Sequence, residues 1–272
     1  MALDMEALAA ILREAAKVEI LPRWRRLTPD MVRVKSHAAD LVTEADEAAE
    51  RLIRARVAGI APEAVFVGEE SVAAGPHLVD RVAESELAVV VDPIDGTGNF
   101  AAGLPLFAVM AAMVRRGETI AGIIYDPFAD DFVMAEKGAG AVLRRPDGTA
   151  VPLAAARAKP LGEMVGAASI SGLPAEPRAR IGANLARTRI ASAYRCAGHE
   201  YRAFASGHLD FLFFNRLLPW DHLAGALIAR EAGAHVARLD GSDYRPGMME
   251  GGLILAADET SWNILRQRVF DL

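Results

Sequence analysis

Cysteine is almost absent from this chain, which has a single one, Cys196, in 272 residues. An intrachain disulfide is therefore excluded, and one thiol is typical of proteins that fold in a reducing cytoplasm. Cationic residues are also in the minority, with 30 Lys and Arg against 36 Asp and Glu and a net charge of −6. Because nucleic-acid-binding proteins usually carry a basic surface, we expect no direct nucleic-acid binding.

Long apolar runs are missing as well, since no stretch reaches the roughly 18 uncharged apolar residues of a membrane span. Segment 1–16 carries Asp4, Glu6, Arg13 and Glu14, and it lacks the basic start and the apolar run of a signal peptide. We therefore expect a cytoplasmic protein that has no membrane partner. Hydrophobic residues still make up 52% of the chain, which excludes global disorder.

The order of predicted elements divides the chain into two halves. Apolar residues at helical spacing predict a helix that Asp4 caps and a second helix from near Ser36 to just before Pro62. Runs at 64–67, 87–91, 107–115, 119–125 and 132–136 then predict an antiparallel meander. Strands at 164–170, 189–193, 209–214 and 253–256 alternate with helices at 176–186, 198–206, 221–232 and 259–270. We expect one domain, 1–272, with an α+β half (1–145) and an α/β half (146–272).

The most informative segment covers residues 91–100. A buried strand delivers Asp92 at its C-terminal end, and Asp95 follows so closely that both carboxylates can meet at one point. Gly96 and Thr97 come next, where free backbone N–H groups can face an anion. Carboxylates beside an anion cradle require a cation, and hard oxygen ligands favour Mg²⁺. The alternative is an ordinary turn that uses Asp and Gly for their backbone preferences.

Two further acidic segments stand at predicted element ends. Glu69 and Glu70 follow the strand at 64–67, and Asp221 opens a helix. Each has a plain alternative: a solvated acidic turn for the glutamates, and for Asp221 a helix cap that contributes about 1 kcal/mol. Together with Asp92 and Asp95, however, they predict a metal cluster. His222, next to Asp221, is expected to face outward or to cap locally.

These segments resemble the motifs of the inositol monophosphatase family, whose members are Mg²⁺-dependent, lithium-sensitive phosphatases. The matching pieces stand in the family order and cover nearly the whole chain: Lys35 with Asp40-Leu41-Val42-Thr43-x-x-Asp46, Gly68-Glu69-Glu70, Asp92-Pro93-Ile94-Asp95-Gly96-Thr97, and Trp220-Asp221-x-x-Ala224-Gly225. The resemblance implies a layered α-β-α-β-α sandwich of the inositol monophosphatase and fructose-1,6-bisphosphatase type. It also implies a homodimer that acts on a small phosphorylated metabolite.

The resemblance further implies a set of metal ligands. Glu69, Asp92 and the carbonyl of Ile94 would hold a first Mg²⁺ ion. Asp92 would bridge to a second ion that Asp95 and Asp221 complete, with two or three ions in each site. In such sites the ions lie about 3.5–4 Å apart, and they activate a water and stabilise the leaving oxygen.

The remaining roles implied by the resemblance concern water and phosphate. Asp46 and Thr97 would orient the attacking water, from which Glu69 can also accept a hydrogen bond. Backbone N–H groups of Gly96 and Thr97 would hold the phosphate oxygens. Lys35 is either an electrostatic neighbour of the acids or a solvated lysine.

The alcohol end of the substrate should meet residues between Arg195 and Arg216. Inositol-specific members carry a glutamate several residues before the Trp-Asp pair, whereas segment 213–219 has no acid here. A bulkier or more anionic alcohol facing Arg195, Tyr201 or Arg216 therefore fits as well as an inositol phosphate. The alternatives are histidinol phosphate, sugar phosphates and 3′-phosphonucleotides.

A non-catalytic alternative also follows from the resemblance. Some members of the family act as interaction partners of the RNA and transcription machinery. A complete acid set argues against a purely structural role, because clustered carboxylates repel one another when no cation is bound. The sequence therefore favours a phosphomonoesterase.

Overall fold

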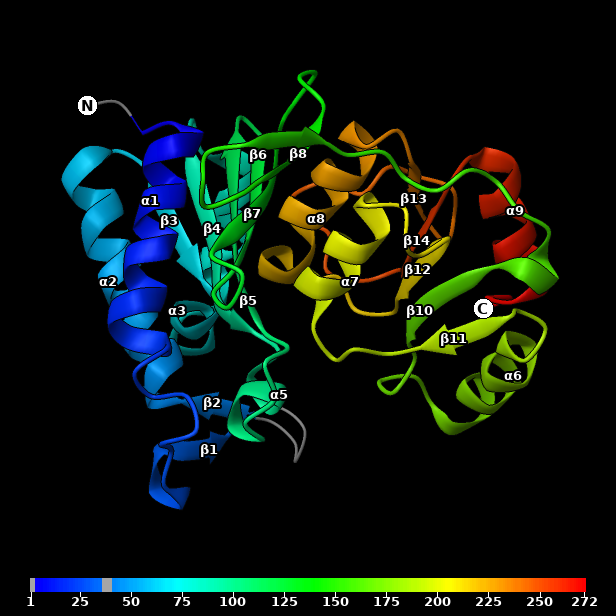
Figure 1. Ribbon diagram of the computed structural model, residues 1–272, viewed down its shortest axis with the longest axis horizontal. Helices are drawn as coiled ribbons and strands as arrows, with labels where there is room; N and C mark the ends of the chain where they lie inside the picture. The colour runs from blue at the N-terminus through cyan, green and yellow to red at the C-terminus, as the bar shows by residue number, and fades with distance from the viewer. Residues whose placement is uncertain (1–2, 36–40) are drawn as a thin grey trace.

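Two β-sheets organise the structure, a computed structural model that describes residues 3–35 and 41–272 (Figure 1). The first sheet has the order β3-β4-β5-β6-β7-β8-β9, and the second has the order β11-β10-β12-β14-β13. The strands of the first are β3 (Val65–Gly68), β4 (Ala88–Asp95), β5 (Ala108–Arg115), β6 (Glu118–Asp126), β7 (Asp131–Glu136), β8 (Ala141–Arg144) and β9 (Ala150–Pro152). Those of the second are β10 (Val165–Ser169), β11 (Ile190–Ser192), β12 (Phe211–Phe214), β13 (His235–Arg238) and β14 (Leu253–Ala256).

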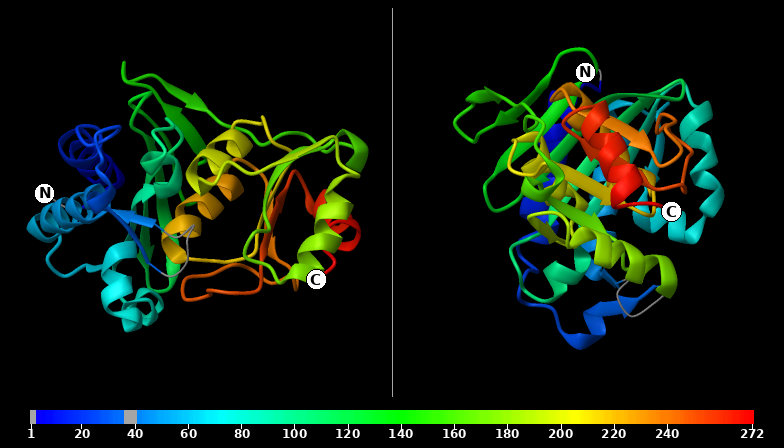
Figure 2. Two further views of the ribbon diagram at one scale, coloured as in Figure 1. Left: turned by 90° about the horizontal axis from the view of Figure 1, so that it is seen from below. Right: turned by 90° about the vertical axis from the view of Figure 1, so that its right-hand side faces the viewer.

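Helices cover and separate the two sheets, which produces five layers (Figures 1 and 2). The first layer is α1 (Met5–Ala15) and α2 (Glu44–Ile60), the middle layer is α7 (Ala197–Ala205) and α8 (Pro219–Glu231), and the last layer is α6 (Ala175–Leu185) and α9 (Glu259–Arg268). One hydrophobic cluster lies between the first helical layer and the first sheet, and another between the second sheet and the last helical layer. The third contains the middle helices and contacts both sheets. The predicted α-β-α-β-α sandwich is confirmed.

Strand pairing differs between the two sheets. From β4 to β9 every neighbouring pair is antiparallel, as expected of a meander, and only β3 is parallel to its neighbour β4. In the second sheet β10 is parallel to both β11 and β12. The last strand, β14, runs antiparallel to β12 and β13. The second sheet is therefore mixed.

Several short elements were not predicted from the sequence. They are the strands β8, β9 and β13 and the helices α3 (Glu69–Ala74) and α4 (Asp80–Glu84). A further short helix, α5 (Thr97–Ala101), follows Gly96. Elements of three to six residues contain too little periodicity to identify, and pairing with a neighbouring strand decides whether such a segment is ordered as a strand. The strand β9 pairs with β8 and completes the first sheet.

The first two helices begin at capping residues. Asp4 caps α1 as predicted, since its Oδ1 accepts from the backbone N–H of Ala7 at 2.8 Å. The predicted start of the second helix near Ser36 is wrong, because α2 begins at Glu44, after the Thr43 cap. Residues Leu41–Thr43 instead form β2, which pairs with β1 (Val32–Val34). Ser36 itself, like Asp40 of the family motif, lies outside the described residues.

The middle-layer helix α8 brings the second half of the chain onto the first sheet through close packing at two glycines. A Cβ atom at Gly225 would lie 2.2 Å from the Tyr201 ring, and one at Gly122 on β6 would lie 2.6 Å from the carbonyl oxygen of Ala224. Any side chain at either position would push α8 away from its neighbours. This packing fixes where the first turn of α8, with Asp221, meets the end of β4.

Two further predictions concern membrane spans and the division of the chain into halves. None of the described helices is both long enough and apolar enough to cross a lipid bilayer. The first sheet ends at Pro152, and residues 153–164 lead from it to the second sheet. The division of one domain into halves at 145 and 146 stays a prediction.

One buried acid in the middle layer makes the stability of the fold depend on pH. Glu200 on α7 is 3% exposed, and its Oε1 accepts from the backbone N–H of Tyr194 at 2.7 Å. Burial raises the pKa of Glu200 to about 7. Because the folded protein holds this proton more tightly than the unfolded chain, its stabilising effect is complete at low pH and is lost as the pH rises to 7.

We predict that Glu200→Gln stabilises the protein at pH 8, because the amide stays neutral and can still accept from Tyr194. The gain in unfolding free energy should be about 1–3 kcal/mol at pH 8 and smaller than about 1 kcal/mol at pH 5. Urea unfolding at both pH values measures it, with the exposed Glu63→Gln as a matched control. An equal change at both pH values would contradict the assignment of the raised pKa to Glu200.

Candidate functional site

The end of β4 places two acids on the same side of the chain. All of β4 is buried, and its pairing with β5 shifts register between Asp92 and Asp95. In a regular strand residues three apart point to opposite faces, but the extra residue of a bulge changes that alternation. The carboxyl of Asp92 is also fixed locally, since its Oδ1 accepts from the backbone N–H of Ile94 at 2.9 Å.

A glycine turn connects β4 to the short helix α5. Gly96 has a φ of +89°, in the left-handed region that residues with a side chain rarely adopt. A Cβ atom at Gly96 would also lie 3.0 Å from the carbonyl oxygen of Leu106. This turn brings the hydroxyl of Thr97 within 3.0 Å of the Ile94 carbonyl oxygen.

Asp95 is held by the N-terminus of α7. Its Oδ1 accepts from Ala197 N–H at 3.1 Å, and its Oδ2 accepts from Gly198 N–H at 2.5 Å and from the Cys196 thiol at 2.9 Å. Burial raises the pKa of Asp95, whereas these donors lower it. Sequence reasoning missed Cys196 in this role, because only the tertiary structure brings it to Asp95.

Asp46 and Thr97 meet as the sequence predicts. The Thr97 hydroxyl lies 3.1 Å from Asp46 Oδ1, while Asp46 Oδ2 accepts from the backbone N–H of Thr43 at 2.9 Å and from its hydroxyl at 2.5 Å. Asp46 is fully buried at the start of α2, and burial raises its pKa to about 7. The same acid therefore closes the helix cap and orients Thr97.

Glu69 and Glu70 share a lysine. The Nζ atom of Lys35 lies 2.7 Å from Glu69 Oε1 and 2.6 Å from Glu70 Oε1. Burial lowers the pKa of Lys35, but the two carboxylates raise it by more, above its ordinary value. Of the two alternatives for this lysine, the structure supports an electrostatic neighbour of the acids.

A second acid on α2, Glu50, also supports this segment and was missed. Glu50 is 4% exposed, and its carboxylate accepts from the backbone N–H groups of Glu70 at 2.7 Å and Ser71 at 3.0 Å. It lies four residues after Asp46 and therefore on the same face of α2. This four-residue spacing from Asp46 is the feature of the sequence that could have identified Glu50.

Asp221 completes the acid cluster from the middle layer. It lies in the first turn of α8, and its carboxyl is hydrogen-bonded to that of Asp92. Burial and the charge of Glu69 raise the pKa of Asp92 well above its ordinary value. Burial and the charge of Asp95 do the same for Asp221. Two carboxyls in direct contact need either a proton or a cation between them.

The donor set suits a divalent cation. Within residues 3–35 and 41–272 no three Asp, Glu, His or Cys side chains form a ready-made metal site, since Asp95 binds α7 and Glu69 binds Lys35. Asp92 and Asp221 nevertheless supply hard oxygen atoms at one point, with Glu69 and Asp95 close enough to act on their pKa values. A cation there would relieve the repulsion that now raises those pKa values.

Two arginines border the acids. Arg195 is exposed and has a left-handed backbone with φ of +57°, and its Nη2 atom lies 2.6 Å from where a Cβ of Gly98 would stand. Arg216 is exposed as well, and its charge acts on Asp221 by lowering that pKa. Both guanidinium groups therefore lie at the rim of the site, one beside the Gly96 turn and the other beside α8.

The sequence profile of the inositol monophosphatase family matches residues 4–270. The chain belongs to the inositol monophosphatase family. An inositol-1-monophosphatase of Mesorhizobium japonicum is 32% identical over 239 residues, which are 85% of this chain and 83% of that protein. The Nus factor SuhB of Vibrio cholerae is 32% identical over 241 residues, or 85% of this chain and 82% of that protein.

Solved structures agree with this family assignment. An inositol monophosphatase (IMPase) of Thermotoga maritima superposes with a TM-score of 0.82 at 25% identity, covering 98% of this chain and 96% of that one. Inositol monophosphatase II of Staphylococcus aureus has a TM-score of 0.80 at 26% identity, covering 98% and 93%. The predicted family and its enzyme class, a phosphomonoester hydrolase, are confirmed.

Two residues of this family member lie elsewhere than predicted. Tyr201 is fully buried, stacks on Phe214 at 5.1 Å and shares a hydrogen bond of 3.1 Å with Nδ1 of His222. It presents no atom to a substrate, so its prediction as a substrate-binding residue is wrong. His222 is 3% exposed, does not face outward, and has a pKa that burial lowers to about 3. Helical periodicity turns both side chains into the core between α7 and α8.

We predict that Tyr201→Phe changes stability and leaves phosphatase activity intact. Loss of the hydroxyl removes its bond to His222 and should lower the unfolding free energy by about 1 kcal/mol, whereas kcat/KM should stay within about twofold. Urea unfolding and phosphate release measure the two effects. A tenfold loss of kcat/KM in a stably folded variant would contradict this prediction and indicate that Tyr201 contributes to substrate binding.

Proposed function

We propose that this protein is a Mg²⁺-dependent phosphomonoesterase that hydrolyses a small phosphorylated alcohol of the inositol 1-phosphate class. The contact between the carboxyls of Asp92 and Asp221 is the observation that carries the proposal. The name of the Mesorhizobium japonicum relative supports the substrate class. Histidinol phosphate, sugar phosphates and 3′-phosphonucleotides are the alternative substrates.

The proposed metal ligands are the side chains of Glu69, Asp92, Asp95 and Asp221 and the carbonyl of Ile94. When bound, two or three Mg²⁺ ions would supply the positive charge that activates a water and stabilises the leaving oxygen. The support for this set is the electrostatics of the cluster, because burial and then the charges of neighbouring acids raise the pKa values of Asp92 and Asp221.

Asp46 and Thr97 would orient the attacking water. When the Thr97 hydroxyl donates its hydrogen bond to Asp46 Oδ1, the lone pairs of that hydroxyl oxygen remain free to accept a hydrogen bond from water. Glu69 would offer a second acceptor. Backbone N–H groups of Gly96 and Thr97 would hold the phosphate oxygens, as the left-handed turn at Gly96 permits.

Arg195 and Arg216 would bind a second negative group on the substrate. Both are exposed at the rim of the site, and neither has a carboxylate within ion-pair distance among the described residues. The position of Arg195 above Gly98 places its charge beside the proposed phosphate cradle. A substrate with two anionic groups would therefore bind one of them at the metal ions that the acids hold and the other at an arginine.

The remaining family properties stay predictions. Lithium sensitivity and assembly as a homodimer rest on family membership. The cytoplasmic location rests on the composition, with one cysteine that is buried.

A role in transcription is the second candidate, because a relative of 32% identity is named Nus factor SuhB. The net charge of −6 favours protein contacts over direct nucleic-acid binding in such a role. A pull-down with RNA polymerase, set beside phosphatase rates, separates the two candidates.

We predict that Asp92→Asn lowers kcat by at least about 1,000-fold, because it removes a bridging charge from the metal site. The fold should persist, since an amide can still bond to Asp221. Millimolar Mg²⁺ should raise the Tm of the unchanged protein and not that of the variant. Asp147→Asn, in a surface turn where Asp147 accepts from Thr149 N–H at 2.8 Å, is the matched control. Phosphate release by Asp92→Asn within tenfold of the unchanged protein would overturn the metal assignment.

We predict that Arg216→Ala lowers kcat/KM chiefly for substrates with two anionic groups, by about 1–2 kcal/mol in transition-state stabilisation. Rates for inositol 1-phosphate, histidinol phosphate, fructose 1,6-bisphosphate and 3′-phosphoadenosine 5′-phosphate measure it. Arg178→Ala on α6 is the control for lost charge. A hundredfold preference for inositol 1-phosphate that the Arg216 substitution leaves unchanged would contradict the prediction.

A further inference from the structure

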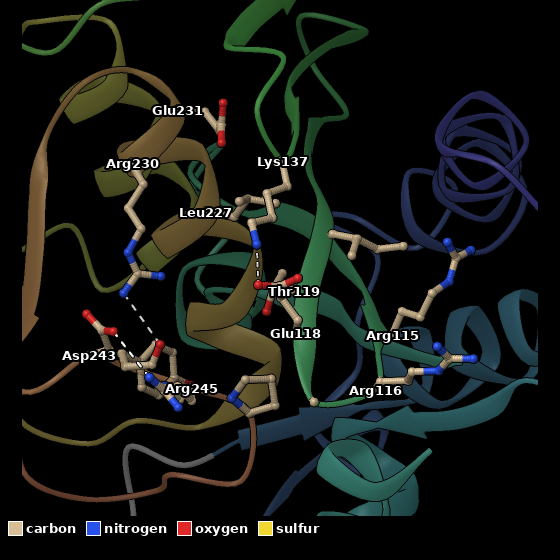
Figure 3. A pocket seen from close by; sticks show the side chains of 14 residues that line it. Arg115, Arg116, Glu118, Thr119, Lys137, Leu227, Arg230, Glu231, Asp243 and Arg245 are labelled. Atoms are coloured by element: carbon tan, nitrogen blue, oxygen red, sulfur yellow. Dashed lines mark hydrogen bonds and ion pairs between the residues drawn. The ribbon is translucent and has the colours of Figure 1, made fainter. Parts of the chain in front are cut away.

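A separate cavity of about 820 Å³ lies at the far end of the middle layer (Figure 3). One wall is the turn between β5 and β6, residues 115–120, with Lys137. The opposite wall is the last turn of α8, with Leu227 and Arg230, and the loop 243–246. Cavities of roughly 300–1,000 Å³ accommodate small molecules. Arg230 lies nine residues after Asp221 on α8, which places the two residues about 14 Å apart along the helix axis.

The lining of this cavity is predominantly cationic, although the chain as a whole is acidic. Five Lys and Arg residues line it against three acids, and the acids already have partners. Glu118 is paired with Lys137, and Asp243 lies 3.5 Å from Arg245. Glu231 accepts from the backbone N–H groups of Gly138 at 2.7 Å and Gly140 at 2.9 Å. Arg116 pairs with Glu86 at 2.7 Å, so Arg115 and Arg230 are the cations of this lining that have no ion pair among the described residues.

Arg230 is the least exposed of the five cations that line this cavity. Its side chain reaches into the cavity, where Nη2 contacts the carbonyl oxygens of Val236 and Tyr244, both at the long distance of 3.4 Å (Figure 3). No carboxylate lies within ion-pair distance of it among the residues that the structure describes. Arg230 is partly buried, and burial lowers its pKa. A partly buried guanidinium group with only neutral acceptors favours the approach of an anion.

We propose that this cavity is a second ligand site, which takes a small polyanion such as a phosphorylated metabolite. Arg230 is the anchor, and Lys137 and Arg245, each already paired with one acid, keep further N–H donors that can reach an anion from the two walls. Leu227 offers an apolar surface for the uncharged part of the ligand. The site is independent of the proposed phosphatase chemistry, because none of its lining residues belongs to the acid cluster.

Calorimetric titration with inorganic pyrophosphate in EDTA tests this site, since the uncompensated acids of the candidate active site repel anions when no metal is bound. We expect one saturable site per chain. Arg230→Met should weaken binding at least about tenfold. Arg178→Met removes another arginine that contacts only a backbone carbonyl, that of Ser171, and should leave binding unchanged.

Two more variants make the result decisive. Arg245→Met alters a side chain that is 69% exposed, so it should keep the fold and weaken binding if Arg230→Met fails to fold. Asp92→Asn should bind pyrophosphate as the unchanged protein does, whatever happens to its phosphatase activity. No saturable binding up to about 10 mM would overturn the proposal. Equal affinity in the folded cavity variants, equal weakening by Arg178→Met, or loss of binding in Asp92→Asn would overturn it as well.

Discussion

Repulsion between carboxylates held out of water is the constraint on which the arrangement of this molecule depends. An uncompensated buried charge is costly, so each acid needs donors, a cation or a proton. Asp95 receives the N–H groups of α7, Asp46 receives those of its own helix cap, and Glu69 receives Lys35. Asp92 receives one backbone N–H, that of Ile94, and its carboxyl also lies beside that of Asp221. Charge at this one contact is therefore compensated least, and a cation would have its largest effect there.

The middle helical layer supplies hydrogen-bond donors to the acid cluster and also packs into the core between the two sheets. Helix N-termini carry partial positive charge, and α7 directs its N-terminus at Asp95 while α8 carries Asp221 in its first turn. Close packing sets the position of each helix. A Cβ at Gly198 would lie 2.8 Å from Ala108 on β5, so α7 can approach the first sheet only because this residue has no side chain. Changes to the packing of this layer would therefore move the acids as well.

Acidic and basic side chains gather in different parts of this protein, and the net charge does not show this separation. The acids gather where β4 ends, Arg195 and Arg216 stand at their rim, and further arginines gather at the opposite end of α8. A net charge of −6 describes the sum and excludes a generally basic surface. It leaves room for local sites of either sign, because charges separated by more than a Debye length, about 8–10 Å, act almost independently in salt.

The sequence by itself determined the features that local chemistry controls. The cap at Asp4, the strands of the meander and the acids at element ends follow from neighbouring residues, and family motifs assign the five-layered fold. The tertiary structure decided the rest. Because residues 41–43 pair with β1, α2 begins only at Glu44. Packing between α7 and α8 buries Tyr201. The thiol of Cys196 reaches Asp95 across 101 residues of sequence, a contact that no local pattern encodes because it depends on how two layers meet.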